Sequence, residues 1–504
     1  MTKGLSRRWV LGTLAGMIGA PGAALAGAPA VSIRPHLRGA AAAPKATAAA
    51  VVADGGAQGV ITRFGLPGEV VCAVADAKSG RPLDAVQDQE GLPPASVAKI
   101  MTTLYALDRL GASYRFRTRL IGTGPVEGGV LRGDLVLAGG GDPTLDTNDL
   151  AALAAELKQK GVREVRGRFL VYDGALPYVR SIDEAQHEHL GYSPAVSGIA
   201  LNFNRVHFQW TRGANGYALA MDARSDRYRP DVTMARMRVV NREVPIFTYS
   251  DRKGVDDWTV ASGALGKDGS RWLPVRRPAD YAGDVFRTMA AAYGIALKPA
   301  EATRSLPGGT VLVSHDSEPL QEVLHDMLKF SNNLTAEMVG MTATASGGQM
   351  PGSLRESAAA MNGWAAARLG MGHTRMVDHS GLGDASRMTA GDLVTALVQA
   401  RQNGALRPLL KPFPMRDAKG RVVKDHPIKV DAKTGTLNFV SGLGGFMTAP
   451  NGKELAFAIF ATDPGKRERS KGVEGDIPEG ARSWNSKAKQ LQQKLIEHWS
   501  AVYS

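Results

Sequence analysis

The apolar positions near the two ends of the chain have the run lengths and spacing of β-strands. Residues 69–77 form an apolar run that ends at the turn-like sequence 78–82, which predicts a strand. Towards the C-terminus, residues 428–436, 439–448 and 455–461 predict three more strands arranged as an antiparallel meander. We therefore expect one sheet that is assembled from both ends of the chain.

Two other stretches repeat their apolar residues at the spacing of a helix with one buried face. The first opens at Ser96, after two prolines, and stops at Gly111. Its apolar positions are Val97, Ile100, Met101, Leu104 and Leu107. The second closes the chain, with its apolar face formed by Trp484, Ala488, Leu491, Leu495 and Trp499.

The middle of the chain, residues 124–274, is rich in short strands and loops. It contains a predicted helix at 150–160 and strand-like runs at 168–172, 205–210, 217–222 and 237–240. A helix at 281–293 is expected to resume the first domain. The pattern predicts an α+β fold in which residues 51–123 and 275–504 form one domain, an antiparallel sheet flanked by helices. Residues 124–274 would be inserted into it as one or two small domains.

Size and composition are consistent with a folded protein of more than one domain. The 504 residues exceed the length at which a single core usually keeps growing, and 44% apolar with 22% charged residues excludes a disordered chain. Beyond the N-terminus, no stretch reaches the ~20 apolar residues that span a bilayer. Cys72, the only cysteine, cannot form an internal disulfide and lies in an apolar run, which predicts a buried small side chain.

Residues 1–26 have the features of a signal peptide. Lys3, Arg7 and Arg8 precede an apolar run, and Ala24-Leu25-Ala26 offers a cleavage site. The two adjacent arginines fit a twin-arginine signal as well as an ordinary secretory one, and both routes stay open. Residues 27–50, rich in Ala and Pro, predict a flexible spacer. We expect an exported, periplasmic protein.

The chain is basic, and export would leave it so. The predicted signal peptide carries three basic and no acidic residues, so its removal lowers the formal charge from +13 to +10. Such a charge allows peripheral association with anionic wall polymers or lipid surfaces, although solubility alone also explains it. Without a dense basic run or a nucleic-acid-binding motif, we expect no nucleic-acid partner.

Ser96 and Lys99 form the first candidate catalytic motif. Three residues apart on a helix, they share a face, and the helix start favours negative charge that develops beside the hydroxyl. A serine becomes a nucleophile when a neighbouring base takes its proton, and a buried lysine whose charge is disfavoured can be that base. The Ser-x-x-Lys spacing is common in proteins, so on its own it does not identify a catalytic site.

Ser331 and Asn333 form the second motif. A hydroxyl near Lys99 could relay a proton to a leaving amine, while the Asn333 side chain could hold Lys99 and a substrate carbonyl.

The third motif is Lys433-Thr434-Gly435-Thr436, in a predicted strand. Its edge could pair with an extended peptide, and Gly435 permits close backbone approach. Lys433 and Thr434 could bind a carboxylate, and the Thr436 and Ser96 amides could form an oxyanion hole.

In this order, the three motifs resemble the D-alanyl-D-alanine carboxypeptidase/endopeptidase family, the low-molecular-mass class C penicillin-binding proteins. Residues 133–144 and 378–382 also resemble segments of that family, although His379 and the following Gly383-Asp384 depart from its pattern. The resemblance implies a β-lactamase/transpeptidase-like domain interrupted by smaller insertion domains. It also implies an acyl-serine hydrolase that acts on peptidoglycan stem peptides, is acylated by β-lactams and needs no metal or other cofactor.

Two alternatives remain at this stage. A class A β-lactamase uses a glutamate downstream of its second motif to activate water, and no glutamate lies between Glu356 and Glu454. A non-catalytic muropeptide-binding sensor is the other alternative, although the candidate nucleophile and base are both present.

His187 and His189 do not predict a metal site, because no further ligands lie at the spacing of such a site. The preference for carboxypeptidase or endopeptidase chemistry and the oligomeric state cannot be read from the sequence.

Overall fold

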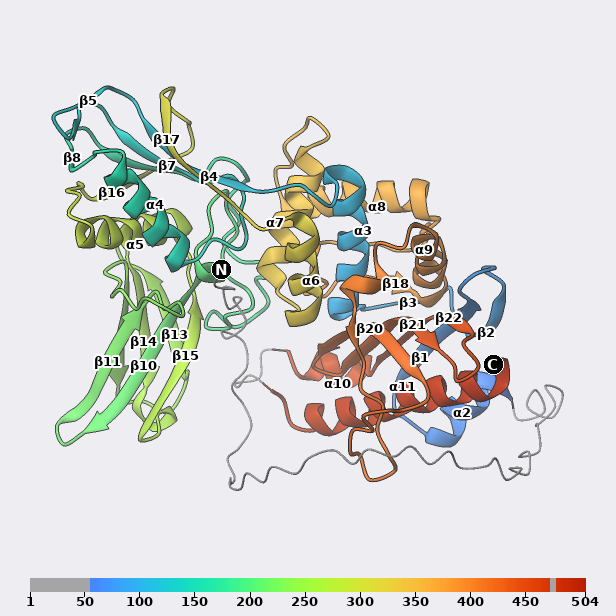
Figure 1. The fold of residues 1–504 in the computed structure, drawn as a ribbon. Coiled ribbons are helices and arrows are strands. Elements are labelled where there is room, and N and C mark those ends of the chain that lie inside the picture. Colours follow the sequence, from blue (N-terminus) through green and yellow to red (C-terminus); the bar gives the residue numbers. More distant parts are fainter. Residues whose placement is uncertain (1–54, 472–476) are drawn as a thin grey trace, which may run out of the picture.

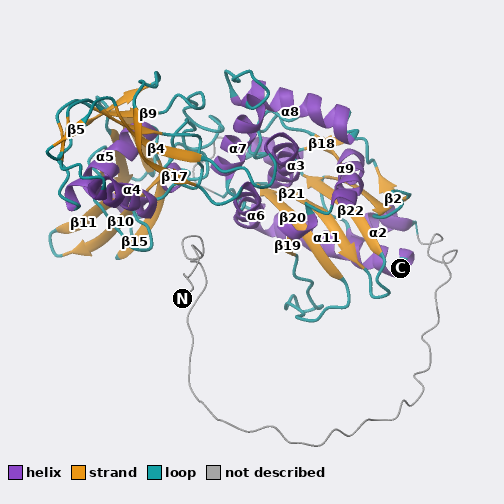
Figure 2. Cartoon of the chain, turned by 45° about the horizontal axis from the view of Figure 1, so that its top comes forward, coloured by secondary structure: helices purple, strands orange, loops and turns teal. Residues whose placement is uncertain are grey.

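The computed structural model describes residues 55–471 and 477–504, and within this part the chain folds into two lobes that lie side by side (Figures 1 and 2). One lobe contains both ends of the described chain, and the other contains its middle. The signal peptide and spacer predicted for residues 1–50 lie outside the described residues. In the described ranges, no helix is both long and apolar enough to cross a bilayer.

The first lobe is built on a six-stranded sheet. Its strands, in spatial order, are β19 (Lys411–Pro412), β20 (Lys429–Leu437), β21 (Val440–Thr448), β22 (Glu454–Thr462), β1 (Glu69–Asp76) and β2 (Pro82–Val86). β1 runs antiparallel to β22, with Glu69 opposite Thr462 and Asp76 opposite Leu455. The predicted sheet from both ends of the chain is therefore confirmed.

Helices cover both faces of this sheet, as Figure 1 shows. Alternate residues of β22 face opposite sides: Phe460 packs among the helices of one face, whereas Phe457 and Ile459 pack against the C-terminal helix. Cys72 is buried on the latter side, as predicted. One face carries α2 (Gly56–Phe64) and α11 (Ala481–Tyr503), and the other carries α3 (Lys99–Leu110), α6 (Leu320–Phe330), α7 (Asn333–Ala345), α8 (Leu354–Leu369) and α9 (Ala390–Asn403).

The second lobe has its own core. A five-stranded sheet has the order β16 (Ala300–Thr303), β9 (Phe169–Tyr172), β7 (Leu135–Ala138), β4 (Arg117–Gly122) and β17 (Thr310–Asp316). Two helices pack with it, α4 (Thr147–Gln159) and α5 (Pro278–Ala292). Two of the three three-stranded sheets in this lobe are β11 (Gly216–Asp222), β10 (Arg205–Gly213) and β15 (Asp268–Pro274), and β12 (Ala235–Val240), β14 (Asp256–Ala261) and β13 (Phe247–Asp251).

The remaining elements are short. β5 (Val126–Glu127), β6 (Val130–Leu131) and β8 (Glu164–Val165) form the third three-stranded sheet, and β3 (Gly91–Leu92) pairs with β18 (Met388–Thr389). The others are the helix α10 (Pro464–Arg469) and the 3₁₀ turns η1 (Ala95–Ala98), η2 (Asn202–Asn204), η3 (Ser262–Ala264) and η4 (Arg407–Leu409).

The inserted lobe extends beyond residues 124–274 at both ends. α5, which we expected to resume the first domain, buries Tyr281, Val285 and Phe286 in the core of the second lobe. β4 before residue 124 and β17 after residue 275 belong to the same five-stranded sheet. The helical periodicity predicted α5 correctly but could not indicate which sheet its apolar face covers.

Candidate active site

The three sequence motifs meet where the two lobes face each other. Lys99 Nζ donates hydrogen bonds to Ser96 Oγ at 2.9 Å, to Asn333 Oδ1 at 2.7 Å and to the Ser380 carbonyl at 3.0 Å. Lys433 Nζ donates to Ser331 Oγ at 2.9 Å. The second motif therefore contacts both of the others, which gives one connected site.

Ser96 lies in η1, the tight turn that leads into α3, rather than in the first turn of α3 itself. Strand β20 approaches this turn so closely that a Cβ on Gly435 would lie 2.6 Å from the Pro94 carbonyl oxygen and 3.0 Å from the Ser96 nitrogen. Only glycine fits there without displacing the turn. The sequence predicts that Gly435 permits another backbone to come close, and in the structure that backbone is the turn that contains Ser96.

Lys99 is completely buried, and this burial lowers its pKa to about 8, while the negative charges of Glu337 and Asp378 act in the opposite direction. Near neutral pH, a lysine with this pKa is partly unprotonated. Its hydrogen bond to Ser96 Oγ places the nitrogen where it can accept the hydroxyl proton.

Glu337 is a site residue that the sequence analysis missed. It is fully buried, and its carboxylate oxygens accept hydrogen bonds from the backbone nitrogens of His379 and Ser380, both at 2.9 Å. These bonds fix the segment whose Ser380 carbonyl binds Lys99. Burial, together with the charge of Asp378, raises the pKa of Glu337 to about 8. Its position four residues after Asn333, on the same face of α7, was the available signal.

Asp378 belongs to the segment that carries Ser380, and its side chain binds backbone groups of that same segment. Its oxygens accept hydrogen bonds from the backbone nitrogens of Gly381 at 2.8 Å and Gly383 at 2.6 Å. Gly381 has φ +76°, and a Cβ there would lie 1.9 Å from the Ala95 carbonyl oxygen. The segment therefore packs directly against the serine turn, which requires glycine at this position.

His379, where the sequence departs from the family pattern, points away from this chemistry. Its ring is buried against Gly340 of α7, and its Nε2 lies 2.8 Å from Ser357 Oγ. Burial lowers its pKa to about 3, so the ring is neutral. The residue fills space between helices and leaves the three motifs intact.

Ser331 and Lys433 are held in unusual states. Ser331 closes α6 in the left-handed region, with φ 60°, which directs its hydroxyl to Lys433. Lys433 is 1% exposed, and burial, reinforced by the charges of Lys99 and Lys411, holds its pKa well below the usual lysine range. Lys433 is therefore a buried partner of Ser331 and not a solvated strand lysine.

A cleft of about 580 Å³ opens onto these residues. β19 pairs only with Asp431 and Ala432 of β20, so within the described chain no other strand covers the outer edge of β20 from Lys433 onwards. Residues that line the cleft are Ser96, Ser331, Asn333 and Thr436 from the motifs, Gln186 and Tyr192 from the inserted lobe, and Arg467, Arg482 and Lys489 from α10 and α11. The cleft can thus admit an extended peptide along a free strand edge, with basic groups beside it.

The inserted lobe also reaches the catalytic groups directly. Asn333 Nδ2 donates a hydrogen bond to the Tyr192 carbonyl at 3.0 Å, while its Oδ1 faces Lys99. This contact, which the sequence did not predict, fixes which end of the Asn333 amide points to the lysine.

The sequence and the fold of this chain are similar to those of known proteins. A family model described as the D-Ala-D-Ala carboxypeptidase 3 (S13) family matches residues 60–477. The chain is 30% identical to a D-alanyl-D-alanine carboxypeptidase of Actinomadura sp. (strain R39) over 421 residues, which cover 77% of this chain and 76% of that protein. It is 24% identical to the D-alanyl-D-alanine carboxypeptidase DacB of Haemophilus influenzae, over 73% of this chain and 79% of the relative. The crystal structure of penicillin binding protein 4 (dacB) from Haemophilus influenzae has the same fold, with a TM-score of 0.71, 18% identity and coverage of 87% of this chain and 99% of that one.

Proposed function

The chain belongs to the D-Ala-D-Ala carboxypeptidase 3 (S13) family and is a serine-type hydrolase of that family, and we propose that Ser96 is its nucleophile and Lys99 its general base. The observation that carries this proposal is the bonding of Lys99 Nζ, which joins Ser96 Oγ to Asn333 Oδ1 in a fully buried position. A buried lysine with a lowered pKa can take the serine proton at neutral pH.

In the acylation step, Lys99 accepts the Ser96 proton while Ser96 Oγ attacks the carbonyl carbon of the penultimate D-alanine. The backbone N–H groups of Ser96 and Thr436 stabilise the negative oxygen that forms, because the serine turn and β20 are in close contact. The proton passes through Ser331 to the nitrogen of the departing residue, and the C–N bond breaks to leave an ester on Ser96. Water then hydrolyses the ester.

Substrate binding involves the free edge of β20. An extended peptide adds to this edge by backbone hydrogen bonds, with Gly435 close to the serine turn. Thr434 and Thr436 bind the terminal carboxylate. Lys433 hydrogen-bonds to Ser331, and its positive charge attracts the same carboxylate. Asn333 holds both Lys99 and the substrate carbonyl. The same groups accommodate a β-lactam, whose ring amide and carboxylate imitate the peptide.

The deacylating machinery of a class A β-lactamase has no counterpart here. Two glutamates lie between Ser331 and Lys433, namely Glu337 and Glu356. Glu337 binds two backbone nitrogens through its two oxygens, and Glu356 Oε2 accepts from the Gly352 backbone nitrogen at 2.8 Å, at the start of α8. Both carboxylates have structural partners, which favours a peptidase that β-lactams inhibit over an enzyme that hydrolyses them.

The place of action follows from the sequence of residues 1–26. A basic start, an apolar run and a small-residue cleavage site support export, and the substrate of the family lies in the cell wall. We accordingly place the mature protein in the periplasm, at the peptidoglycan. Its basic charge supports peripheral contact with anionic wall polymers.

The direct test is digestion of purified pentapeptide and of cross-linked muropeptides, with products identified by mass spectrometry. Release of a terminal D-alanine from the first substrate identifies carboxypeptidase activity, and cleavage of the cross-link identifies endopeptidase activity. The Ser96→Ala variant is the control, since it retains the fold and lacks the nucleophile. Wild-type protein that cleaves neither substrate, or a Ser96→Ala variant with wild-type activity, would contradict the proposal.

A further inference from the structure

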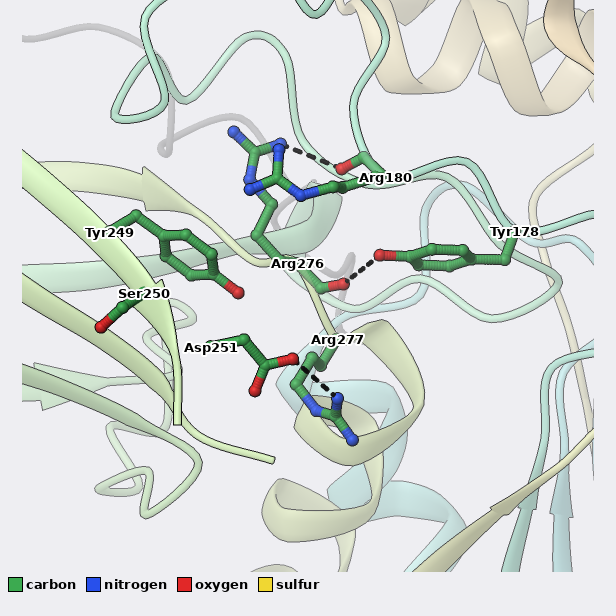
Figure 3. Close-up of a pocket in the computed structure, with 7 residues that line it drawn as sticks. All are labelled: Tyr178, Arg180, Tyr249, Ser250, Asp251, Arg276 and Arg277. Atoms are coloured by element: carbon green, nitrogen blue, oxygen red, sulfur yellow. Dashed lines mark hydrogen bonds and ion pairs between the residues drawn. The ribbon is translucent and has the colours of Figure 1, made fainter. Parts of the chain in front are cut away.

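One segment of the inserted lobe, residues 180–193, lies between a pocket in that lobe and the active-site cleft. On one side, Gln186 and Tyr192 line the cleft. On the other side, Arg180 lines a pocket of about 380 Å³ together with Tyr178, Tyr249, Arg276 and Arg277 (Figure 3). We call this segment the 180–193 loop.

Two hydrogen bonds within the loop connect its first half to its second half. The backbone nitrogen of Asp183 donates to Ser193 Oγ at 3.0 Å, and the Tyr192 hydroxyl donates to Gln186 Oε1 at 3.0 Å. A displacement of one end of the loop is therefore transmitted to the Tyr192 carbonyl.

Arg276 binds this loop to the inserted lobe. Its guanidinium group donates to three main-chain carbonyls of the loop: Arg180 at 3.0 Å, Ser193 at 2.8 Å and Glu188 at 2.8 Å. It also forms an ion pair with the Glu188 carboxylate at 3.1 Å. Arg276 is only 3% exposed, so water cannot easily replace these bonds.

The backbone of Arg276 is itself fixed in the lobe. Its nitrogen donates to Asp256 Oδ2 at 2.9 Å, and its carbonyl accepts from the Tyr178 hydroxyl at 2.9 Å, as Figure 3 shows for the latter. The Tyr249 hydroxyl holds the other oxygen of Asp256 at 2.9 Å. The backbone of Arg276 is thus fixed in the inserted lobe, while its guanidinium group holds the loop.

The far end of the loop controls the orientation of Asn333. The Tyr192 carbonyl, adjacent to the Ser193 carbonyl that Arg276 binds, accepts the hydrogen bond from Asn333 Nδ2. An amide has a donor end and an acceptor end, and only the acceptor end can bind the Lys99 ammonium. Withdrawal of the Tyr192 carbonyl would remove the contact that selects this orientation.

We propose that Arg276 is a positioning residue for the catalytic serine: by holding three carbonyls of the 180–193 loop, it places the Tyr192 carbonyl that orients Asn333 against Lys99. This inference rests on the proposed roles of Ser96 and Lys99. It assigns to the inserted lobe a part in the chemistry, beyond its contribution to the walls of the cleft.

The test compares Arg276→Ala with Arg277→Ala. Arg277 borders the same pocket but pairs with Asp251 and Asp280, on β13 and α5, rather than with the loop. For Arg276→Ala, we expect the rate constant for acylation of Ser96 by a β-lactam to fall at least tenfold, with less than threefold change in the preceding noncovalent affinity. Amide hydrogen exchange in residues 180–193 should accelerate. The Arg277→Ala variant should acylate within twofold of wild type.

Chemical rescue separates positioning from general destabilisation. The side chain removed by Arg276→Ala lines the 380 Å³ pocket, so its space is accessible to a small cation. Methylguanidinium at millimolar concentration should restore acylation, and urea at the same concentration should not. If Arg276→Ala does not fold, Arg276→Lys is measured instead, with the same criteria.

Two kinetic results would overturn the inference: acylation within twofold of wild type in a folded Arg276 variant, whatever its loop exchange, or an equal loss in Arg277→Ala. Loop exchange equal to wild type in a folded Arg276 variant would also overturn it, whether or not Ser96 reacts. Wild-type protein that no β-lactam acylates would instead contradict the proposed function.

Discussion

Lys433 donates a hydrogen bond from Nζ to Oγ of Ser331, forming a second buried lysine–serine pair beside Lys99 and Ser96. The two pairs are electrostatically linked, because the charge of Lys99 helps to lower the pKa of Lys433. Ser96 and Ser331 line the same cleft, so we expect a proton that leaves Ser96 to have a nearby route towards Ser331.

The first prediction concerns this route. Replacing Ser331 by Ala removes the relay hydroxyl, and we expect acylation by a peptide or β-lactam to slow by about 10²-fold or more, as for the loss of a general acid–base group. Ser331→Gly is the matched variant, since glycine tolerates the φ of 60° without strain. Both variants should lose activity alike in single-turnover measurements. Near-wild-type rates in either would exclude the relay.

The second prediction concerns pH. Only unprotonated Lys99 can accept the serine proton, so the acylation rate constant should rise with pH and level off above the lysine pKa of about 8. Glu337 raises that pKa, so Glu337→Gln should move the midpoint to lower pH. Glu356→Gln removes the same charge at the start of α8 and should leave the midpoint unchanged. An unchanged or higher midpoint in Glu337→Gln would show that the profile does not report Lys99.

The third prediction concerns the lifetime of the acylated enzyme. Since Glu337 and Glu356 are both engaged with backbone nitrogens, neither glutamate is placed to activate water on a penicilloyl ester. We expect a β-lactam adduct on Ser96 that persists long after excess drug is removed, detectable by intact-protein mass spectrometry and absent from Ser96→Ala. Rapid return of the unmodified mass with release of hydrolysed drug would instead identify a β-lactamase.

The fourth prediction concerns the packing of His379. A Cβ on Gly340 would lie 2.2 Å from the His379 ring, so Gly340→Ala should lower the free energy of unfolding by about 1–3 kcal/mol. His379→Ala should relieve the clash in the double variant. The control is Gly363→Ala on α8, where a Cβ meets nothing within 4 Å and should be neutral or slightly stabilising. Thermal or denaturant unfolding is measured for the wild type, Gly340→Ala, His379→Ala, the double variant and Gly363→Ala. Additive losses in the double variant would rule out the clash.

Much of the fold was predictable because its elements carry strong local patterns. β1, β21 and β22 are apolar runs bounded by turns, and α11 has a regular apolar face. The boundary of the inserted lobe was not predictable, because α5 presents an apolar face that would suit either sheet. Which sheet a helix covers depends on contacts distant in sequence.

The site was predictable to the extent that its groups fall into motifs. Lys99 hydrogen-bonds to Ser96 and Asn333, and Lys433 hydrogen-bonds to Ser331. Glu337 and Arg276 could not be identified, because each acts through backbone groups of a distant segment: Glu337 binds amide nitrogens, and Arg276 binds carbonyl oxygens. Backbone groups are present at every residue, so the sequence carries no sign of which ones are bound.

The pairing of β1 with β22 has a consequence for biosynthesis. Strand β1, which precedes Ser96, is among the first folded segments to be made, yet its partner β22, with Thr462 opposite Glu69, is synthesised almost four hundred residues later. The inserted lobe has its own core and can form in the meantime, whereas the sheet beneath Ser96 cannot close. A hydrolase built in this way completes the sheet beneath Ser96 only when translation is nearly complete, so we expect chains truncated before β22 to be inactive.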